Sequence, residues 1–107
     1  MFGFQNLDVY KCANAFLPKA YAFAGGLDGE MASQLRRAAL SINLNIAEGS
    51  GRFDKDQRRF YLFARGSALE CAAILDAAKA LGKQVEPIEE CLVLLDRIVA
   101  MLTKMAR

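Results

Sequence analysis

The 107-residue chain contains no histidine, no tryptophan and only two prolines. Without histidine, a serine or cysteine nucleophile lacks its most common general base, and the Glu-x-x-His pairs of a di-iron bundle cannot form. A transmembrane helix needs about 20 apolar residues, whereas the charge-free stretches are short, as at residues 38–47. The sequence therefore argues against an enzyme, a metalloprotein and a membrane-spanning protein, and we predict no catalytic residue, no metal site and no cofactor.

Cysteine is also scarce. Cys12, Cys71 and Cys91 are an odd number at wide spacing, which fits neither a disulfide framework nor a paired metal motif. We expect buried structural thiols. The first residues have no basic segment and no sustained apolar segment, so we expect no secretory signal and a cytoplasmic location.

What the chain does have is helical periodicity. Apolar residues recur at intervals of three and four nearly throughout, and the strict alternation of strands is missing. We predict a single all-α domain over residues 1–107, an antiparallel up-down four-helix bundle. The expected helices cover about 7–23, 28–48 and 54–81, and a fourth begins near Pro87. Pro18 predicts a kink or break over 14–18, and Asp28 and Asp54 are the expected N-caps.

The second and third helices each carry two apolar faces. One face of each helix is expected to lie in the core. Asn45 is on the core face of the second helix, and Phe60 and Phe63 are on the core face of the third, so Tyr61 is the aromatic residue expected to be exposed. The opposite faces would form an apolar patch if left in water, so we predict that a ring-like homo-oligomer covers them. The predicted interface residues are Leu40, Leu44, Ala47, Leu62, Leu69 and Ala73.

Basic charge is concentrated in the middle of the chain. Residues 36–65 hold seven basic and three acidic residues, a local charge of +4, whereas the remainder holds seven basic and nine acidic, a charge of −2. Such a surface, repeated around an oligomer, favours contact with nucleic-acid phosphates. The alternative is that Arg58 and Arg59 form an ordinary solvated face while Arg36, Arg37 and Arg52 pair with carboxylates. The expected partner of Glu48 is Arg52 or an arginine of the second helix, either within the chain or across the ring. The candidate nucleic-acid-binding residues are Arg36, Arg37, Arg52, Lys55, Arg58, Arg59 and Arg65.

One stretch resembles a known family. Residues 34–42, followed by Asn-Ile-Ala-Glu-Gly-Ser-Gly-Arg at 45–52, are similar to the most recognisable segment of the bacterial 23S rRNA intervening-sequence protein family. The third helix adds matches at Phe60, Ala64, Gly66, Ser67 and Glu70. The chain lacks the prolines that members usually carry near residues 27–30 and at Asn43. Within the shared segment, we expect Asn45, Glu48, Gly49 and Gly51 to have structural roles.

The resemblance implies four-helix bundles. The family includes the accessory variability proteins of diversity-generating retroelements. These proteins look like pentameric rings of four-helix bundles that bind a reverse transcriptase and nucleic acid. The resemblance therefore implies a pentamer, a number that the residues alone do not give. We predict a non-enzymatic homo-oligomer that binds RNA, DNA or a ribonucleoprotein. The alternative is a scaffold that docks a protein such as a reverse transcriptase without touching nucleic acid.

Overall fold

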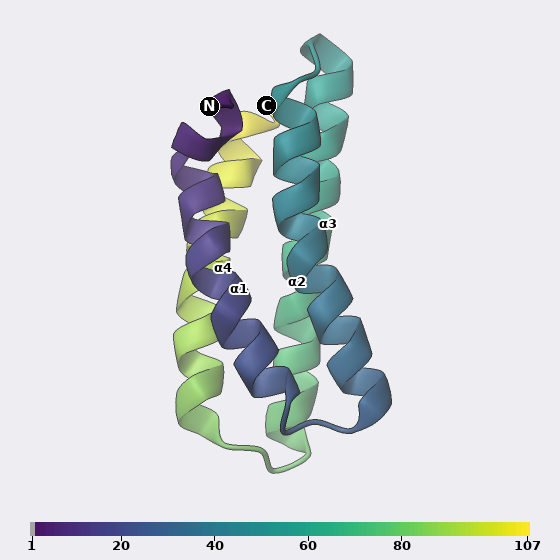
Figure 1. Ribbon diagram of the computed structural model, residues 1–107. Coiled ribbons are helices and arrows are strands. Elements are labelled where there is room, and N and C mark those ends of the chain that lie inside the picture. Colours follow the sequence, from purple (N-terminus) through teal and green to yellow (C-terminus); the bar gives the residue numbers. More distant parts are fainter. Residues whose placement is uncertain (1) are drawn as a thin grey trace.

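The computed structural model describes residues 2–107 and contains four long helices (Figure 1). A short 3-10 helix, η1 (Gly3–Asn6), precedes α1 (Asp8–Ala24), α2 (Gly29–Ser50), α3 (Asp54–Ala80) and α4 (Val85–Met105). No strand occurs within the described residues. The predicted all-α class and the four helices are confirmed.

Each long helix packs against two others. α2 contacts α1 and α3, and α4 contacts α3 and α1, so the four helices enclose one core in a molecule 43 Å long. Both chain termini and the α2–α3 turn lie at one end of the molecule, and the other two connections lie at the opposite end (Figure 1). The α2–α3 turn projects beyond both termini at its end.

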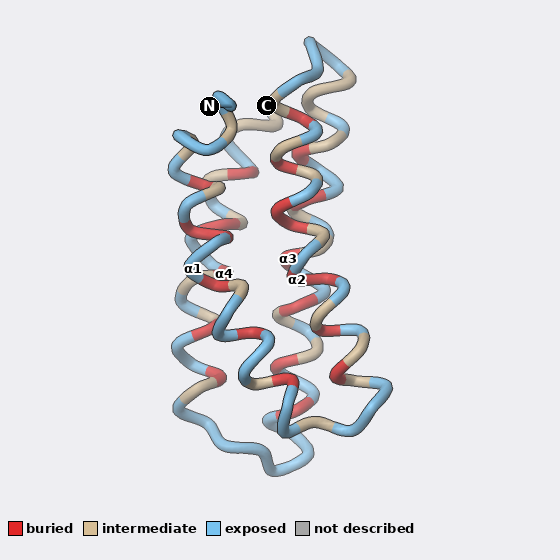
Figure 2. Tube along the Cα trace, in the orientation of Figure 1, coloured by how far each residue is buried: buried red, intermediate tan, exposed pale blue. Residues whose placement is uncertain are grey.

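The buried positions follow the helical period on the inner side of every helix (Figure 2). In α2, for example, Leu35, Ala39, Ile42 and Ile46 are fully buried. Alanines at the inner positions of α1 and α3 allow neighbouring helices to approach closely. The largest fully buried side chains are Phe16, Leu35, Ile42, Ile46, Leu75, Ile88, Leu95, Ile98 and Leu102.

Sequence rules for the helix ends succeeded in part. The Asp28 carboxylate accepts a hydrogen bond from the Met31 amide at 3.0 Å, so the predicted cap is confirmed. The cap assigned to Asp54 is wrong, because Asp54 lies inside α3 with φ of +51° and Phe53 is the N-cap. Of the predicted kink or break at Pro18, the break is wrong, because α1 runs through Pro18 without interruption, and the kink stays a prediction.

The side chains that face the core differ from the prediction in α2 and in α3, by one or two residues along the sequence. The buried amide of α2 is Asn43, at 3% exposure, and it donates to the Asn14 side chain at 2.7 Å. Asn45 is only half-buried and donates to the Ser41 carbonyl. In α3, Tyr61 is buried at 5% exposure, whereas Phe63, which we placed in the core, is 48% exposed.

Candidate nucleic-acid interface

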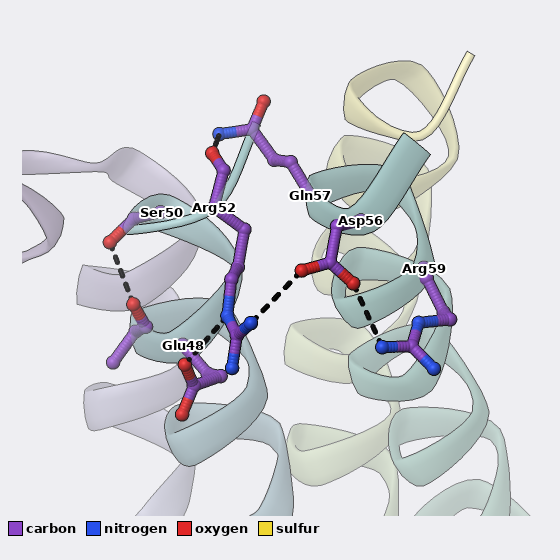
Figure 3. Close-up of polar contacts among 7 residues, drawn as sticks. Glu48, Ser50, Arg52, Asp56, Gln57 and Arg59 are labelled. Carbon is purple, nitrogen blue, oxygen red and sulfur yellow. Dashed lines mark hydrogen bonds and ion pairs between the residues drawn. The ribbon is translucent and has the colours of Figure 1, made fainter. Parts of the chain in front are cut away.

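The α2–α3 turn carries the densest group of charges (Figure 3). Arg52 lies just after the end of α2. Its guanidinium group donates to the Glu48 carboxylate at 3.0 Å and to the carboxylate of Asp56, in the first turn of α3, also at 3.0 Å. Asp56 also accepts from Arg59 at 2.8 Å. The predicted Glu48–Arg52 pair is therefore present, within one chain, and it belongs to a four-residue network that joins α2 to α3.

The network stabilises the charged forms of two of its members. The hydrogen bond from Arg59, with the added charge of Arg52, lowers the pKa of Asp56, and the hydrogen bond to Glu48 raises the pKa of Arg52. Exposed ion pairs of this kind contribute little to stability, because solvent screens them. Their main effect is to hold the two guanidinium groups in position.

The same arginines lie over aromatic rings. The guanidinium carbon of Arg52 is 5.0 Å from the centroid of the Phe60 ring, and that of Arg59 is 5.3 Å from the same ring. Arg59 also lies 5.7 Å from the ring of Phe63, which packs edge-on against Phe60. Cation–π contacts of this geometry orient a guanidinium without neutralising it. Arg52 and Arg59 are therefore held in place at the surface of the turn, where the carboxylates of Glu48 and Asp56 balance their charge.

Two further cations beside the turn are not neutralised. Lys55 and Arg58, in the first turns of α3, form no ion pair with any residue between 2 and 107. Lys55 is exposed and Arg58 is half-buried. Because phosphate contact depends on cations that can exchange a counterion for a phosphate, these two side chains are available to a phosphate, as are Arg36 and Arg37, which also form no ion pair in the described part of the chain.

The other three predicted cations lie elsewhere. Arg36 and Arg37 are in the middle of α2, roughly 20 Å along the helix from Arg52 at about 1.5 Å per residue. Arg65 donates to the Thr103 hydroxyl at 2.9 Å, so it is directed toward α4. The structure therefore brings Arg52, Lys55, Arg58 and Arg59 together, and it separates Arg36, Arg37 and Arg65 from them.

A buried contact sets the position of this cluster. Gly49 lies inside the last turn of α2, where an added Cβ would be 2.8 Å from the Tyr61 ring and 3.1 Å from the Phe60 Cβ. Because Gly49 has no side chain, α2 and α3 can approach each other closely next to the arginines of the turn. Gly51, by contrast, has a negative φ, and an added Cβ would make only an ordinary contact, 3.7 Å from the Glu48 carbonyl oxygen, so its role is confined to the turn.

Several large apolar side chains of α2 and α3 are exposed, as predicted. Leu44 is 59% exposed, Leu62 is 52% and Leu69 is 45%. Leu40 and Ala73 are also exposed, whereas Ala47 is half-buried and lines a shallow depression with Phe2 and Phe4. Five of the six predicted interface residues therefore lie at the surface.

Two aromatic residues of this region escaped the sequence analysis. Phe53 is 82% exposed, and Phe63 stacks beneath Arg59. The signal for Phe53 was its place in a turn, immediately after Gly-Ser-Gly-Arg and before a run of charged residues. The signal for Phe63 was weaker, because its spacing also fits a core position.

No group of three or more Cys, Asp or Glu side chains within residues 2–107 is arranged to hold a metal ion. None of the helices in this part of the chain has both the length and the apolar character needed to cross a bilayer.

Comparison with known proteins agrees with the sequence resemblance. A family model described as 23S rRNA-intervening sequence protein matches residues 5–104, which include all four long helices almost completely. No curated protein matches the chain. The match includes the turn cluster and the apolar outer surface of α2 and α3. The chain belongs to the 23S rRNA-intervening sequence protein family.

Proposed function

We propose that this protein is a non-enzymatic homo-oligomer that binds nucleic acid, or a ribonucleoprotein, through the cations of the α2–α3 turn. The observation that carries the proposal is the turn cluster itself. Arg52, Lys55, Arg58 and Arg59 lie within eight residues, and Lys55 and Arg58 have no carboxylate partner in the described chain. Arginine and lysine arranged in this way favour phosphate oxygens as partners.

The proposal includes a ring of antiparallel four-helix bundles. Its support is the exposed apolar surface formed by Leu40, Leu44, Leu62, Leu69 and Ala73, since apolar patches of this kind on a small domain mark subunit or partner contacts. Five subunits is the number that the family resemblance implies. A ring would carry one turn cluster on each subunit, so weak phosphate contacts would add through avidity.

The test of nucleic-acid binding is a charge reversal with a matched control. Arg58→Glu combined with Arg59→Glu should weaken binding to a labelled RNA or DNA and flatten its salt dependence. The slope of log K against log salt should fall by about 1.4 for a single strand if both arginines contact phosphate. Lys79→Glu with Lys83→Glu changes the net charge equally at the opposite end and should leave the slope unchanged. Equal effects of both pairs would contradict a localised site.

The test of the oligomer uses the outer surface. Leu44→Glu should dissociate the assembly, because it places a carboxylate in an apolar contact. Val93→Glu is the matched control, since Val93 on α4 is 60% exposed and lies outside the predicted interface. Light scattering gives the mass of each variant. Dissociation by both substitutions, or by neither, would reject the proposed interface.

The second candidate is a scaffold that docks a partner protein such as a reverse transcriptase. The observation that favours it is the same apolar surface, because Leu62 and Leu69 can serve a foreign chain as well as a second copy. In that case the arginines contribute to subunit contacts. If Arg58→Glu with Arg59→Glu dissociates the oligomer instead of weakening nucleic-acid binding, the scaffold is favoured.

A further inference from the structure

The most exposed large apolar side chain that the structure describes is Phe53, at 82%. It stands at the α2–α3 turn, the part of the molecule that projects beyond the termini (Figure 1). Burying a phenylalanine side chain stabilises a fold, and this position forgoes that contribution. A single exposed apolar residue is common and by itself indicates nothing. Its surroundings distinguish it.

The backbone that carries Phe53 is held on both sides. The Phe53 carbonyl accepts hydrogen bonds from the amides of Asp56 at 3.1 Å and Gln57 at 3.2 Å. The preceding residue is held as well, since the Gln57 side chain donates to the Arg52 carbonyl at 3.1 Å (Figure 3) and the Arg52 amide donates to Gly49. The phenyl ring therefore projects from a hydrogen-bonded turn.

The residues around Phe53 carry charges of both signs. Arg52, which precedes it, is paired with Glu48 and Asp56, and Asp54 follows it directly. Lys55 and Arg58 follow within five residues and form no ion pair between residues 2 and 107. An aromatic ring close in sequence to two unpaired cations provides the two contacts that single-stranded nucleic acids need: a face on which a base stacks, and charges for the adjacent phosphates.

We propose that Phe53 stacks on an unpaired base of a single-stranded RNA or DNA, while Lys55 and Arg58 contact the flanking phosphates. This inference rests on the proposed nucleic-acid binding and specifies its substrate as single-stranded. In a duplex, both faces of an internal base are covered by its neighbours, so a ring on a surface turn reaches them only at ends or loops. The duplex would retain the phosphate contacts and lose the stacking.

The absence of tryptophan from the chain supplies a direct test, because Phe53→Trp creates a single emitter at the proposed contact. An oligothymidylate of about 15 nucleotides, the size of a typical single-strand site, should strongly quench its fluorescence at saturation. A duplex of equal length should bind with little quenching. Tyr21→Trp, at a 41% exposed position on α1, is the control and should not respond.

Affinity measurements complete the test. Phe53→Ala should weaken binding of the single strand by roughly 5- to 150-fold, the range measured for loss of one stacked base, and Phe53→Tyr should restore it. Phe53→Leu keeps an apolar side chain without an aromatic face and should behave like Phe53→Ala. The salt slope should stay unchanged in all three, because no charge is altered.

The failures are distinguishable. If the wild-type protein binds neither strand type, the proposed function fails and this inference fails with it. If the wild type binds and Phe53→Ala binds equally well, only the stacking is refuted. Equal quenching by single strand and duplex also refutes it. Blue-shifted emission from Trp at position 53 in the free protein would show that another subunit covers the side chain, which again overturns the inference.

Discussion

The sharpest prediction for the fold concerns the contact that brings α2 and α3 together below the arginine cluster. In Gly49→Ala, the new methyl carbon would lie 2.8 and 2.9 Å from two carbons of the Tyr61 ring and 3.1 Å from the Phe60 Cβ. Carbon atoms prefer separations of about 3.5–4.0 Å, so the ring has to move by roughly 0.7 Å or more. Tyr61 is 5% exposed, and little free space is available to it.

Overpacking of this kind costs about 1–3 kcal/mol. Alanine gains up to about 1 kcal/mol over glycine inside a helix, and less at Gly49, which lies one residue from the end of α2. We therefore expect a net loss of about 1–2 kcal/mol in the free energy of unfolding. For a domain of this size, that lowers Tm by roughly 4–16 °C.

The matched control is Gly66→Ala. Gly66 lies inside α3, and an added Cβ would meet nothing within 4 Å, so the helix propensity acts alone and the substitution should stabilise the protein by up to about 1 kcal/mol. Urea unfolding followed by circular dichroism, at two protein concentrations to separate association from folding, measures both variants. If Gly49→Ala is as stable as Gly66→Ala, the close approach at Tyr61 is refuted.

Three other predictions follow from buried or strained positions. Burial raises the pKa of the Cys71 thiol to about 12, above its unfolded value near 9, so the contribution of the neutral thiol to stability is complete below pH 9 and is lost as the pH rises toward 12. Unfolding curves at alkaline pH should show this loss of stability. Ellman's reagent at pH 8 should label Cys71 only after the protein has unfolded. Asn43→Asp would bury a carboxylate in the core and should destabilise the protein by more than about 2 kcal/mol at pH 7, with recovery on acidification in thermal melts; stability equal to the wild type would contradict the burial of Asn43. Asp54→Val places a branched side chain at a φ of +51° and should cost about 1–2 kcal/mol more than Asp54→Asn in urea; equal midpoints would reject that backbone conformation.

The sequence predicted elements better than it predicted faces. Asp28 marks the start of α2 by a local hydrogen bond, and Gly82, with φ of +87°, ends the segment after α3, so both ends depend on nearby residues alone. The Glu48–Arg52 pair is local as well, since residues four apart on a helix are neighbours. Such features are readable because they need no knowledge of the partner helix.

The exposure of the α3 aromatics could not be predicted in this way. α3 packs against α2 and α4 together, so its buried arc is wide, and a shift of one or two residues exchanges Tyr61 with Phe60 or Phe63. What decides the exchange is the absence of a side chain at Gly49 on another helix, which admits the Tyr61 ring. Sequence periodicity contains no information about that contact. The exposure of Phe53 likewise depends on how far the turn projects.

The central claim is that one protein both assembles through the outer surface of α2 and α3 and binds nucleic acid through the turn. The most direct test is light scattering of the purified chain at low and moderate salt, alone and with a short single-stranded RNA or DNA. The account predicts a salt-stable oligomer whose mass rises when nucleic acid is added at low salt, and less so at moderate salt. A monomer, or an oligomer whose mass ignores nucleic acid at both salt concentrations, would contradict it.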